Sequence, residues 1–199
     1  DRLYPTPDAF PEVEVVIQRD VLGDIATLAR EAGLPLVVHA AGGMGKTVLM
    51  QGLADRLRAD GPVVLFDGFG AGRWRDPADG RHLPERTLVH LANLMAGQGL
   101  CDILLPVADV TGLLRAFRRR LAQSVETARR TRSDACVSLV LDAIDHAGLA
   151  ARETATSSFA HLLMRSISVE PIDGVRIVVS CRTERLALAT GDTSHRPFT

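Results

Sequence analysis

The hydrophobic residues of this chain gather in short continuous runs, separated by longer segments in which they recur at helical spacing. The runs cover residues 36–40, 63–67, 136–142 and 175–180, and apolar residues follow one another there almost without interruption. Such runs are typical of parallel strands that are buried on both faces of a sheet. We therefore predict four strands of a mainly parallel central sheet.

Helical patterns lie before and between these runs. Apolar residues recur every three or four positions within 13–32, 47–59, 84–95, 109–130 and 156–168. Pro84 stands where proline is favoured, at the first position of a helix. Helices that alternate with strands predict an α/β fold in which helices cover both faces of the sheet, as a three-layer αβα sandwich.

Polar and proline-containing ends bound the predicted domain. We expect residues 1–33 to form a lead-in and a first helix, 34–189 the α/β domain, and 190–199 a polar tail or a linker to a missing C-terminal region. The tail contains no fifth apolar run, so the sequence predicts a domain truncated before its last strand and lid. A first residue of Asp1 rather than Met suggests a fragment of a longer protein.

A glycine-rich loop joins the first predicted strand to the next helix. Glycines allow positive φ and let backbone N–H groups approach a phosphate, at the positive end of the following helix. Lys46 would reach the β- and γ-phosphates, and the Thr47 hydroxyl would hold Mg²⁺. The sequence thus predicts a P-loop NTPase fold with ATP or ADP and Mg²⁺ as cofactors. The residues expected to bind the nucleotide are Ala41, Gly42, Gly43, Met44, Gly45, Lys46, Thr47 and Val48.

Composition supports this interpretation of the loop. The chain carries 23 Lys plus Arg, and Lys46 is its only lysine. Retention of one lysine here points to a site that suits a compact ammonium group and not a planar guanidinium. The pattern G-x-x-x-x-G-K-[ST] is met except at its first position, which is Ala40.

The run at 136–142 ends in an acid, as the Walker B strand of such folds does. Asp142 would lie at the carboxyl end of its strand, where open α/β sheets bind ligands, and would hold Mg²⁺ together with Thr47. Asp145 is close enough in sequence to orient an attacking water. Arg182, at the tip of the strand 175–180, would face the γ-phosphate and report its presence. Asp142, Asp145 and Arg182 are therefore the candidate catalytic residues.

Charge and cysteine content exclude several other classes. A net charge of −1 gives no strong signal for nucleic-acid or anionic-membrane binding, and no apolar run approaches the roughly 18 residues of a spanning helix. Three cysteines without metal spacing favour free thiols in a reducing cytoplasm. Arginines at 73, 75 and along 115–130 could contact a base or an acidic partner, but a surface role is the interpretation we favour.

The loop Ala-x-Gly-Gly-x-Gly-Lys-Thr, the run Leu-Asp-Ala-Ile-Asp and the strand end Val-Val-Ser-Cys-Arg resemble the STAND class of P-loop NTPases, the NACHT and NB-ARC proteins. The resemblance covers roughly residues 34–185. It implies that Lys46 and Thr47 bind phosphate and Mg²⁺, that Asp142 serves the metal, Asp145 is the second acid and Arg182 the sensor. Ala40 and His146 depart from the family pattern, and His146 replaces a further acid, which suggests slow hydrolysis.

Members of that family are multidomain switches in immunity, antiphage defence or transcriptional control. The resemblance implies an ATP-binding module that self-oligomerises when ATP is bound, in response to a ligand sensed by a missing C-terminal region. Two alternatives remain open from the sequence. A P-loop phosphotransferase would need an acceptor pocket and a lid, and a AAA-type motor ATPase would show stimulated, sustained turnover.

Overall fold

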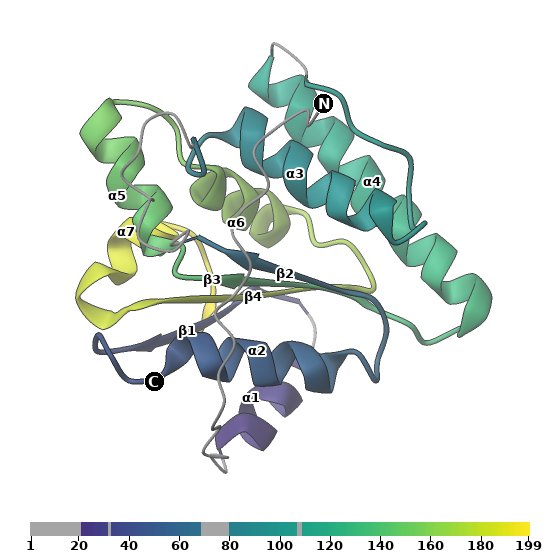
Figure 1. Cartoon of the computed structure of the whole chain (residues 1–199), viewed down its shortest axis with the longest axis horizontal. Coiled ribbons are helices and arrows are strands. Elements are labelled where there is room, and N and C mark those ends of the chain that lie inside the picture. The colour runs from purple at the N-terminus through teal and green to yellow at the C-terminus, as the bar shows by residue number, and fades with distance from the viewer. Residues whose placement is uncertain (1–20, 32, 69–79, 107–108) are drawn as a thin grey trace.

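A parallel five-stranded sheet forms the centre of the molecule (Figure 1). The computed structural model describes residues 21–31, 33–68, 80–106 and 109–199. In space the strands follow the order β2-β3-β4-β1-β5, and every neighbouring pair is parallel. The strands are β1 (Leu36–Ala40), β2 (Val63–Asp67), β3 (Val137–Asp142), β4 (Val175–Arg182) and β5 (Arg196–Phe198).

Helices cover both faces of this sheet, as the alternating pattern predicts. Helices α1 and α2 lie against one face, whereas α3, α4 and α6 lie against the other (Figure 1). The helices are α1 (Val21–Arg30), α2 (Lys46–Leu57), α3 (Pro84–Gly97), α4 (Val110–Thr131), α5 (Asp145–Thr154), α6 (Phe159–Val169) and α7 (Leu186–Thr190), with a 3-10 turn, η1 (Thr183–Arg185), before α7.

Two hydrophobic clusters, one on each face, account for the continuous apolar runs. Val140 of β3 packs into the cluster beneath α1 and α2, while its neighbours Leu139 and Leu141 pack into the cluster beneath α3, α4 and α6. Successive residues of a strand point to opposite faces, so a strand covered on both sides must be apolar throughout. The predicted α/β fold with its parallel sheet is confirmed.

The prediction that a fifth strand is missing is wrong. Strand β5 pairs in parallel with β1, placing Arg196 opposite Leu36 and Phe198 opposite Val38. The strand has only three residues, one of them Pro197, and it lies at the edge of the sheet, where proline is tolerated. A strand of three residues is too short to show a hydrophobic pattern, and the rest of 190–199 is largely polar. The sequence therefore predicted a polar tail for this segment.

Other elements differ from the prediction in extent. Helix α6 begins at Phe159, three residues later than expected, and β3 begins at Val137. Helices α5 and α7 were not predicted at all. The lead-in and the segment 13–20 of the first predicted helix lie outside the described residues, as do the arginines at 73 and 75.

The arginine-rich side of α4 has a mixed role. Arg118 donates to the Ser166 and Glu170 carbonyls, Arg120 to the carbonyls of 102 and 103, and Arg129 pairs with Asp173. Arg115 and Arg119 are exposed, as a solvated face requires. Several of these arginines therefore fasten neighbouring segments to α4.

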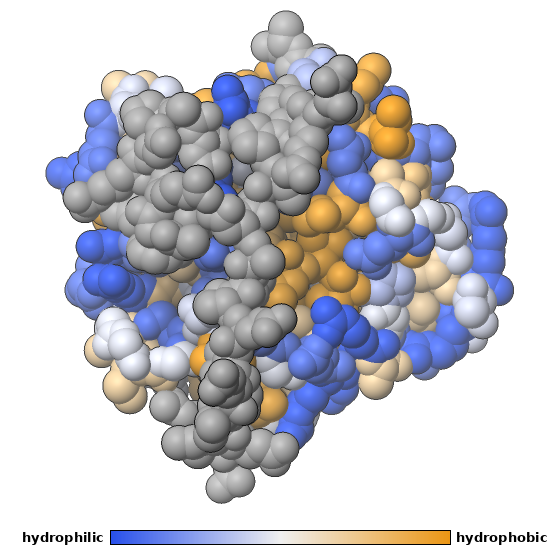
Figure 2. Space-filling view, in the orientation of Figure 1, coloured by the Kyte–Doolittle hydropathy of each residue, from blue (hydrophilic) through white to orange (hydrophobic). Residues whose placement is uncertain are grey.

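Strand β2 forms the other edge of the sheet. Figure 2 shows apolar side chains gathered on the visible face between α2 and α3, where β2 passes in Figure 1, with mostly hydrophilic residues to the right.

No helix within the described ranges combines the length and the apolar character that crossing a membrane demands.

Candidate functional site

The loop between β1 and α2 has the backbone conformation that phosphate binding requires. Gly43 and Gly45 both have φ of 78°, in the left-handed region that favours glycine. Gly45 is the N-cap of α2, and no side chain caps this helix, so its first N–H groups remain available to an anion. A Cβ added at Gly43 would meet no heavy atom within 4 Å, so the concavity is open above this residue.

Lys46 folds back over the loop. Its Nζ donates to the carbonyl oxygens of Ala40, at 2.9 Å, and Ala41, at 2.8 Å. Both acceptors are neutral, so an anionic phosphate oxygen would be a stronger partner for the same ammonium group. The lysine therefore lies at the loop, where the sequence predicts it.

Asp142 is the centre of a buried hydrogen-bond network at the carboxyl end of β3. Thr47 Oγ1 donates to Asp142 Oδ2 at 2.6 Å, and Ser180 Oγ on β4 donates to Asp142 Oδ1. Ser180 Oγ also accepts from the backbone N–H of Ala143 at 2.9 Å. Thr47 and Asp142 lie 95 residues apart in sequence, and the fold brings the two predicted Mg²⁺ ligands into direct contact.

The carboxyl group of Asp142 is shielded from water, with 2% of the residue exposed. Burial raises its pKa above the usual range, and the neighbouring Asp67 carboxylate raises it further, whereas the hydrogen bonds from Ser180 and Thr47 lower the pKa. A divalent cation would favour the ionised form, because it supplies the positive charge that this cluster of oxygens lacks.

Asp145 occupies a different environment from Asp142. It is the first residue of α5, is 1% exposed, and has Arg185 Nη1 at 3.6 Å from its Oδ2. Burial raises the pKa of Asp145, while Arg185, Arg182 and Lys46 lower it. The charge of Lys46 therefore acts on the pKa of Asp145, but the ion pair of Asp145 is formed with Arg185 of η1.

Arg182 lies where a sensor of the phosphate would be expected. In the β1–β4 register it is opposite Ala40, the last residue of β1 before the loop. Its guanidinium carbon is 3.6 Å from the place where a Cβ on Gly42 would stand. The Arg182 side chain thus lies next to Gly42, the first glycine of the loop, at a distance that is ordinary van der Waals contact for a Cβ.

The structure brings all predicted site residues to one end of the sheet. Met44 is 49% exposed at the tip of the loop, Ala41 is exposed, and Val48 lies in the first turn of α2. Two further residues, Ser180 and Arg185, were not predicted. Ser180 is two residues before Arg182 and therefore on the same face of β4, which was the available signal in the sequence.

The donor set fits a nucleotide with Mg²⁺. Thr47 and Asp142 supply the hydroxyl and carboxylate oxygens that this hard cation prefers, and the loop supplies N–H groups and one ammonium. Within the described ranges, no cluster of three or more His, Cys, Asp or Glu side chains is placed to hold a metal.

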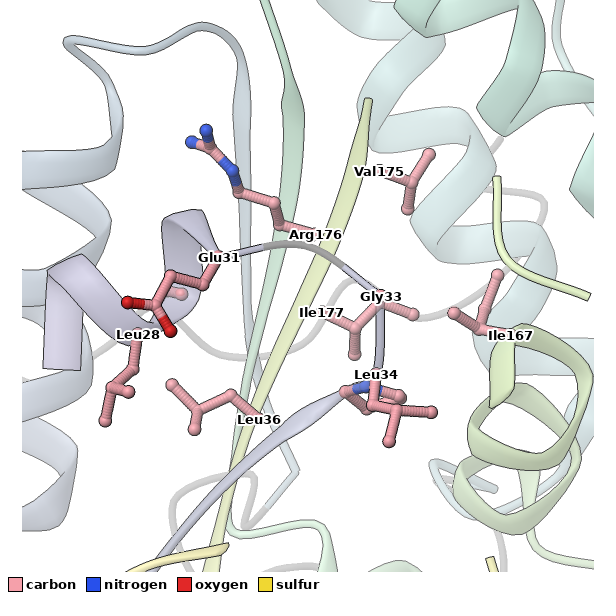
Figure 3. A pocket seen from close by; sticks show the side chains of 11 residues that line it. Leu28, Glu31, Gly33, Leu34, Leu36, Ile167, Val175, Arg176 and Ile177 are labelled. Atoms are coloured by element: carbon pink, nitrogen blue, oxygen red, sulfur yellow. The ribbon is translucent and has the colours of Figure 1, made fainter. Parts of the chain in front are cut away.

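The pocket in Figure 3 lies away from this site. It is lined by α1, by the first residue of β1 (Leu36), by the start of β4 (Val175 to Ile177), and by Ile167 of α6. These are the amino ends of the strands, opposite the loop. Its volume of about 20 Å³ is room for about one water molecule.

Comparison with known proteins adds little to this geometry. No family model and no curated protein matches the chain. Among solved structures, the chain is similar to the structure of the Aeropyrum pernix ORC2 protein in ADPNP-ADP complexes. The two chains share 15% sequence identity, and the TM-score is 0.48. The match covers 98% of this chain and 51% of that one, so the chain spans about half the length of the protein it resembles.

Proposed function

We propose that this chain is the ATP-binding, slowly hydrolysing switch module of a multidomain STAND-type signalling or defence protein. The observation that carries the nucleotide proposal is the 2.6 Å contact between Thr47 Oγ1 and Asp142 Oδ2, beside a loop with two left-handed glycines and the chain's only lysine. These parts come from separate motifs, and together they match the needs of a phosphate chain and its metal.

In this proposal each residue has a distinct task. The N–H groups of Gly42 to Gly45 and the Lys46 ammonium bind the phosphates, and Thr47 with Asp142 holds Mg²⁺ and its water shell. When bound, the metal would neutralise charge that develops on the phosphates. Arg182, beside the loop, distinguishes ATP from ADP through the γ-phosphate.

The switch itself rests on the resemblance to STAND proteins and on general physics. A γ-phosphate and its metal hold nearby elements in one arrangement, which relaxes when the phosphate is lost. We propose self-oligomerisation in the ATP-bound state and a trigger ligand sensed outside these residues. Slow hydrolysis is supported by the pairing of Asp145 with Arg185 and by His146 in place of a further acid.

The test measures ATP affinity and assembly state for the wild type and Lys46→Ala, with Mg²⁺ present. Loss of one charge-assisted contact of about 1.5–3 kcal/mol should weaken ATP binding roughly ten- to hundred-fold. Arg130→Ala is the matched control, because it removes an exposed cation from α4 that pairs only at the surface with Glu126.

Unchanged ATP affinity in Lys46→Ala would refute the nucleotide site. ATP binding with slow turnover and an ATP-dependent change in molecular mass would support the switch. Fast turnover stimulated by an acceptor molecule would instead indicate a phosphotransferase, and fast turnover stimulated by a polymer would indicate a motor ATPase.

A further inference from the structure

The ion pair between Asp145 and Arg185 contains no hydrogen bond. Arg185 Nη1 is 3.6 Å from Asp145 Oδ2, and both atoms are buried. Neither atom has a hydrogen-bond partner among the residues that the structure describes. The distance is too long for a hydrogen bond, so charge alone holds the two groups together. Because buried polar atoms without partners cost free energy, this contact is one that the molecule can exchange for a better one.

The backbone keeps the two residues of this pair next to each other. Asp145 is the first residue of α5, and Arg185 is the last residue of η1, directly before α7. The N–H of Ile144, just before α5, donates to a carbonyl of β4 at 3.0 Å. Farther along, a Cβ on Gly148 of α5 would stand 1.9 Å from a carbonyl oxygen of α7. An exchange of partners must therefore come from movement of a side chain.

The two partners differ in their freedom to make that movement. The Asp145 side chain is 1% exposed, whereas the Arg185 side chain is 24% exposed. An arginine also has more rotamers than an aspartate. Arg185 is therefore the partner that can leave. As long as it stays, no water reaches Asp145 Oδ2, because this oxygen is buried.

A bound nucleotide would bring a competing anion to this pair. Burial raises the pKa of Asp145, while the charges of Arg185, Arg182 and Lys46 lower it, so all three cations act on the same acid. In the proposed site, Lys46 and Arg182 also serve the phosphates. Arginine forms strong and often bidentate hydrogen bonds with phosphate. A γ-phosphate would thus draw on the cations that now face Asp145.

We propose that Arg185 is a positioning residue that keeps the Asp145 carboxylate from the attacking water and thereby makes ATP hydrolysis slow. The inference rests on the proposed nucleotide site. When Arg185 leaves, Asp145 Oδ2 accepts a hydrogen bond from the water. The water oxygen forms a bond to the γ-phosphorus while the bond to the β–γ bridging oxygen breaks. ADP leaves with that electron pair, and the water proton passes to the Asp145 carboxylate and then to solvent or phosphate.

The experiment compares wild type, Arg185→Gln, Asp145→Asn and the double variant in the whole chain, with Arg176→Gln as the matched control. Arg176 also forms a partly buried ion pair, at 2.7 Å with Asp60, but it lies near the amino end of β4, at the opposite edge of the sheet from the loop. Three quantities are measured: the affinity for MgATP, the single-turnover hydrolysis rate, and the free energy of unfolding in urea without nucleotide.

Arg185→Gln should bind MgATP as the wild type does and hydrolyse it faster. We expect a gain of at least about tenfold, which is part of the roughly 10²–10⁴-fold that a positioned general base contributes. The double variant should lose this gain, because the acid that Arg185 restrains is then absent. Arg176→Gln should hydrolyse ATP at the wild-type rate.

Unfolding without nucleotide tests the contact itself, apart from catalysis. Arg185→Gln leaves the buried Asp145 carboxylate without its cation, and Asp145→Asn leaves Arg185 without its anion. The double variant should therefore lose less stability than the sum of the two single losses. If Arg185→Gln fails to fold, Arg185→Lys replaces it. Lysine keeps the positive charge on a different, more flexible side chain, and a rate above that of the wild type is again expected.

An unchanged or slower rate in Arg185→Gln, or in Arg185→Lys where that variant replaces it, would overturn the proposal. A gain that persists in the double variant would also overturn it, because Arg185 would then act through another group. Additive losses of stability would show that the two side chains do not interact, with the same consequence. If the wild type and Arg185→Gln both bind MgATP and neither hydrolyses it, the role of Arg185 is refuted and the nucleotide switch stands. Failure of the wild type to bind MgATP would refute the proposed function, and this inference with it.

Discussion

Ser180 offers a test of the site that needs no nucleotide. Its hydroxyl donates to Asp142 Oδ1 and accepts from the Ala143 N–H, and the residue is completely buried. Ser180→Ala removes a hydrogen bond to a charged group, which contributes about 1.5–3 kcal/mol, and leaves a buried N–H without its partner, which costs about 1–3 kcal/mol. The two effects together predict a loss of at least about 2.5 kcal/mol in the free energy of unfolding.

The assay is urea unfolding at neutral pH without Mg²⁺, and thermal unfolding as a second measure. For a chain of this size, the loss corresponds to a fall in Tm of roughly 5–10 °C. Ser138→Ala is the matched control, because Ser138 is also a buried serine of the sheet, with 1% exposed, and its hydroxyl has no hydrogen-bond partner among the described residues. This control should be neutral or slightly stabilising.

Equal effects of the two serine substitutions would refute the reasoning, because burial and volume would then explain both results. A loss below about 0.5 kcal/mol in Ser180→Ala would show that the network around Asp142 contributes no more than an ordinary surface contact.

Three further predictions follow from the geometry. Gly68→Ala should destabilise the protein by about 1–3 kcal/mol in urea unfolding, because its Cβ would stand 2.6 Å from the Asp142 carbonyl oxygen. Gly97→Ala in α3, which has open space around it, should stabilise the protein slightly. The opposite order of the two effects would contradict the close approach of Gly68 to β3. Because the pKa of Asp142 is raised in the folded protein, protonation of Asp142 favours the folded state. Its contribution to the free energy of unfolding should be fully present below pH 3.8 and should be lost as the pH rises through the folded pKa. Asp142→Asn should reduce this loss of stability with rising pH, measured by unfolding without Mg²⁺ over a pH series. Asp109→Ala should cost about 1 kcal/mol, because the Asp109 side chain accepts from Thr111 N and Gly112 N at the start of α4, and an unchanged Tm would argue against this cap.

The sequence predicted the parts of the site that are encoded locally. The glycine loop, Lys46 and Thr47 form one continuous segment, and Asp142 ends a long apolar run, so spacing alone places them. Ser180 and Asp67 lie beside Asp142 only because β4 and β2 lie on either side of β3. Sequence reasoning does not give this strand order, and Asp67 therefore had the same pattern as any acid at the end of a strand.

The missed elements have equally specific causes. The buried side of α5 is made largely of Ala147, Gly148, Ala150 and Ala151, which give a weak hydrophobic pattern. Gly148 is required there because a Cβ would stand 1.9 Å from the Leu188 carbonyl of α7. Close packing between two short helices is thus encoded by small residues, and a search for large apolar residues does not find it.

The hydrogen bonds of Lys46 and Thr47 bear on how a ligand would enter. The lysine is satisfied by the Ala40 and Ala41 carbonyls, and the threonine by Asp142. A phosphate and its cation would have to displace these internal partners of Lys46 and Thr47, while the uncapped N–H groups at the start of α2 would gain new ones. The measured affinity would report the difference between two sets of bonds, and departure of the nucleotide would return both side chains to their internal partners.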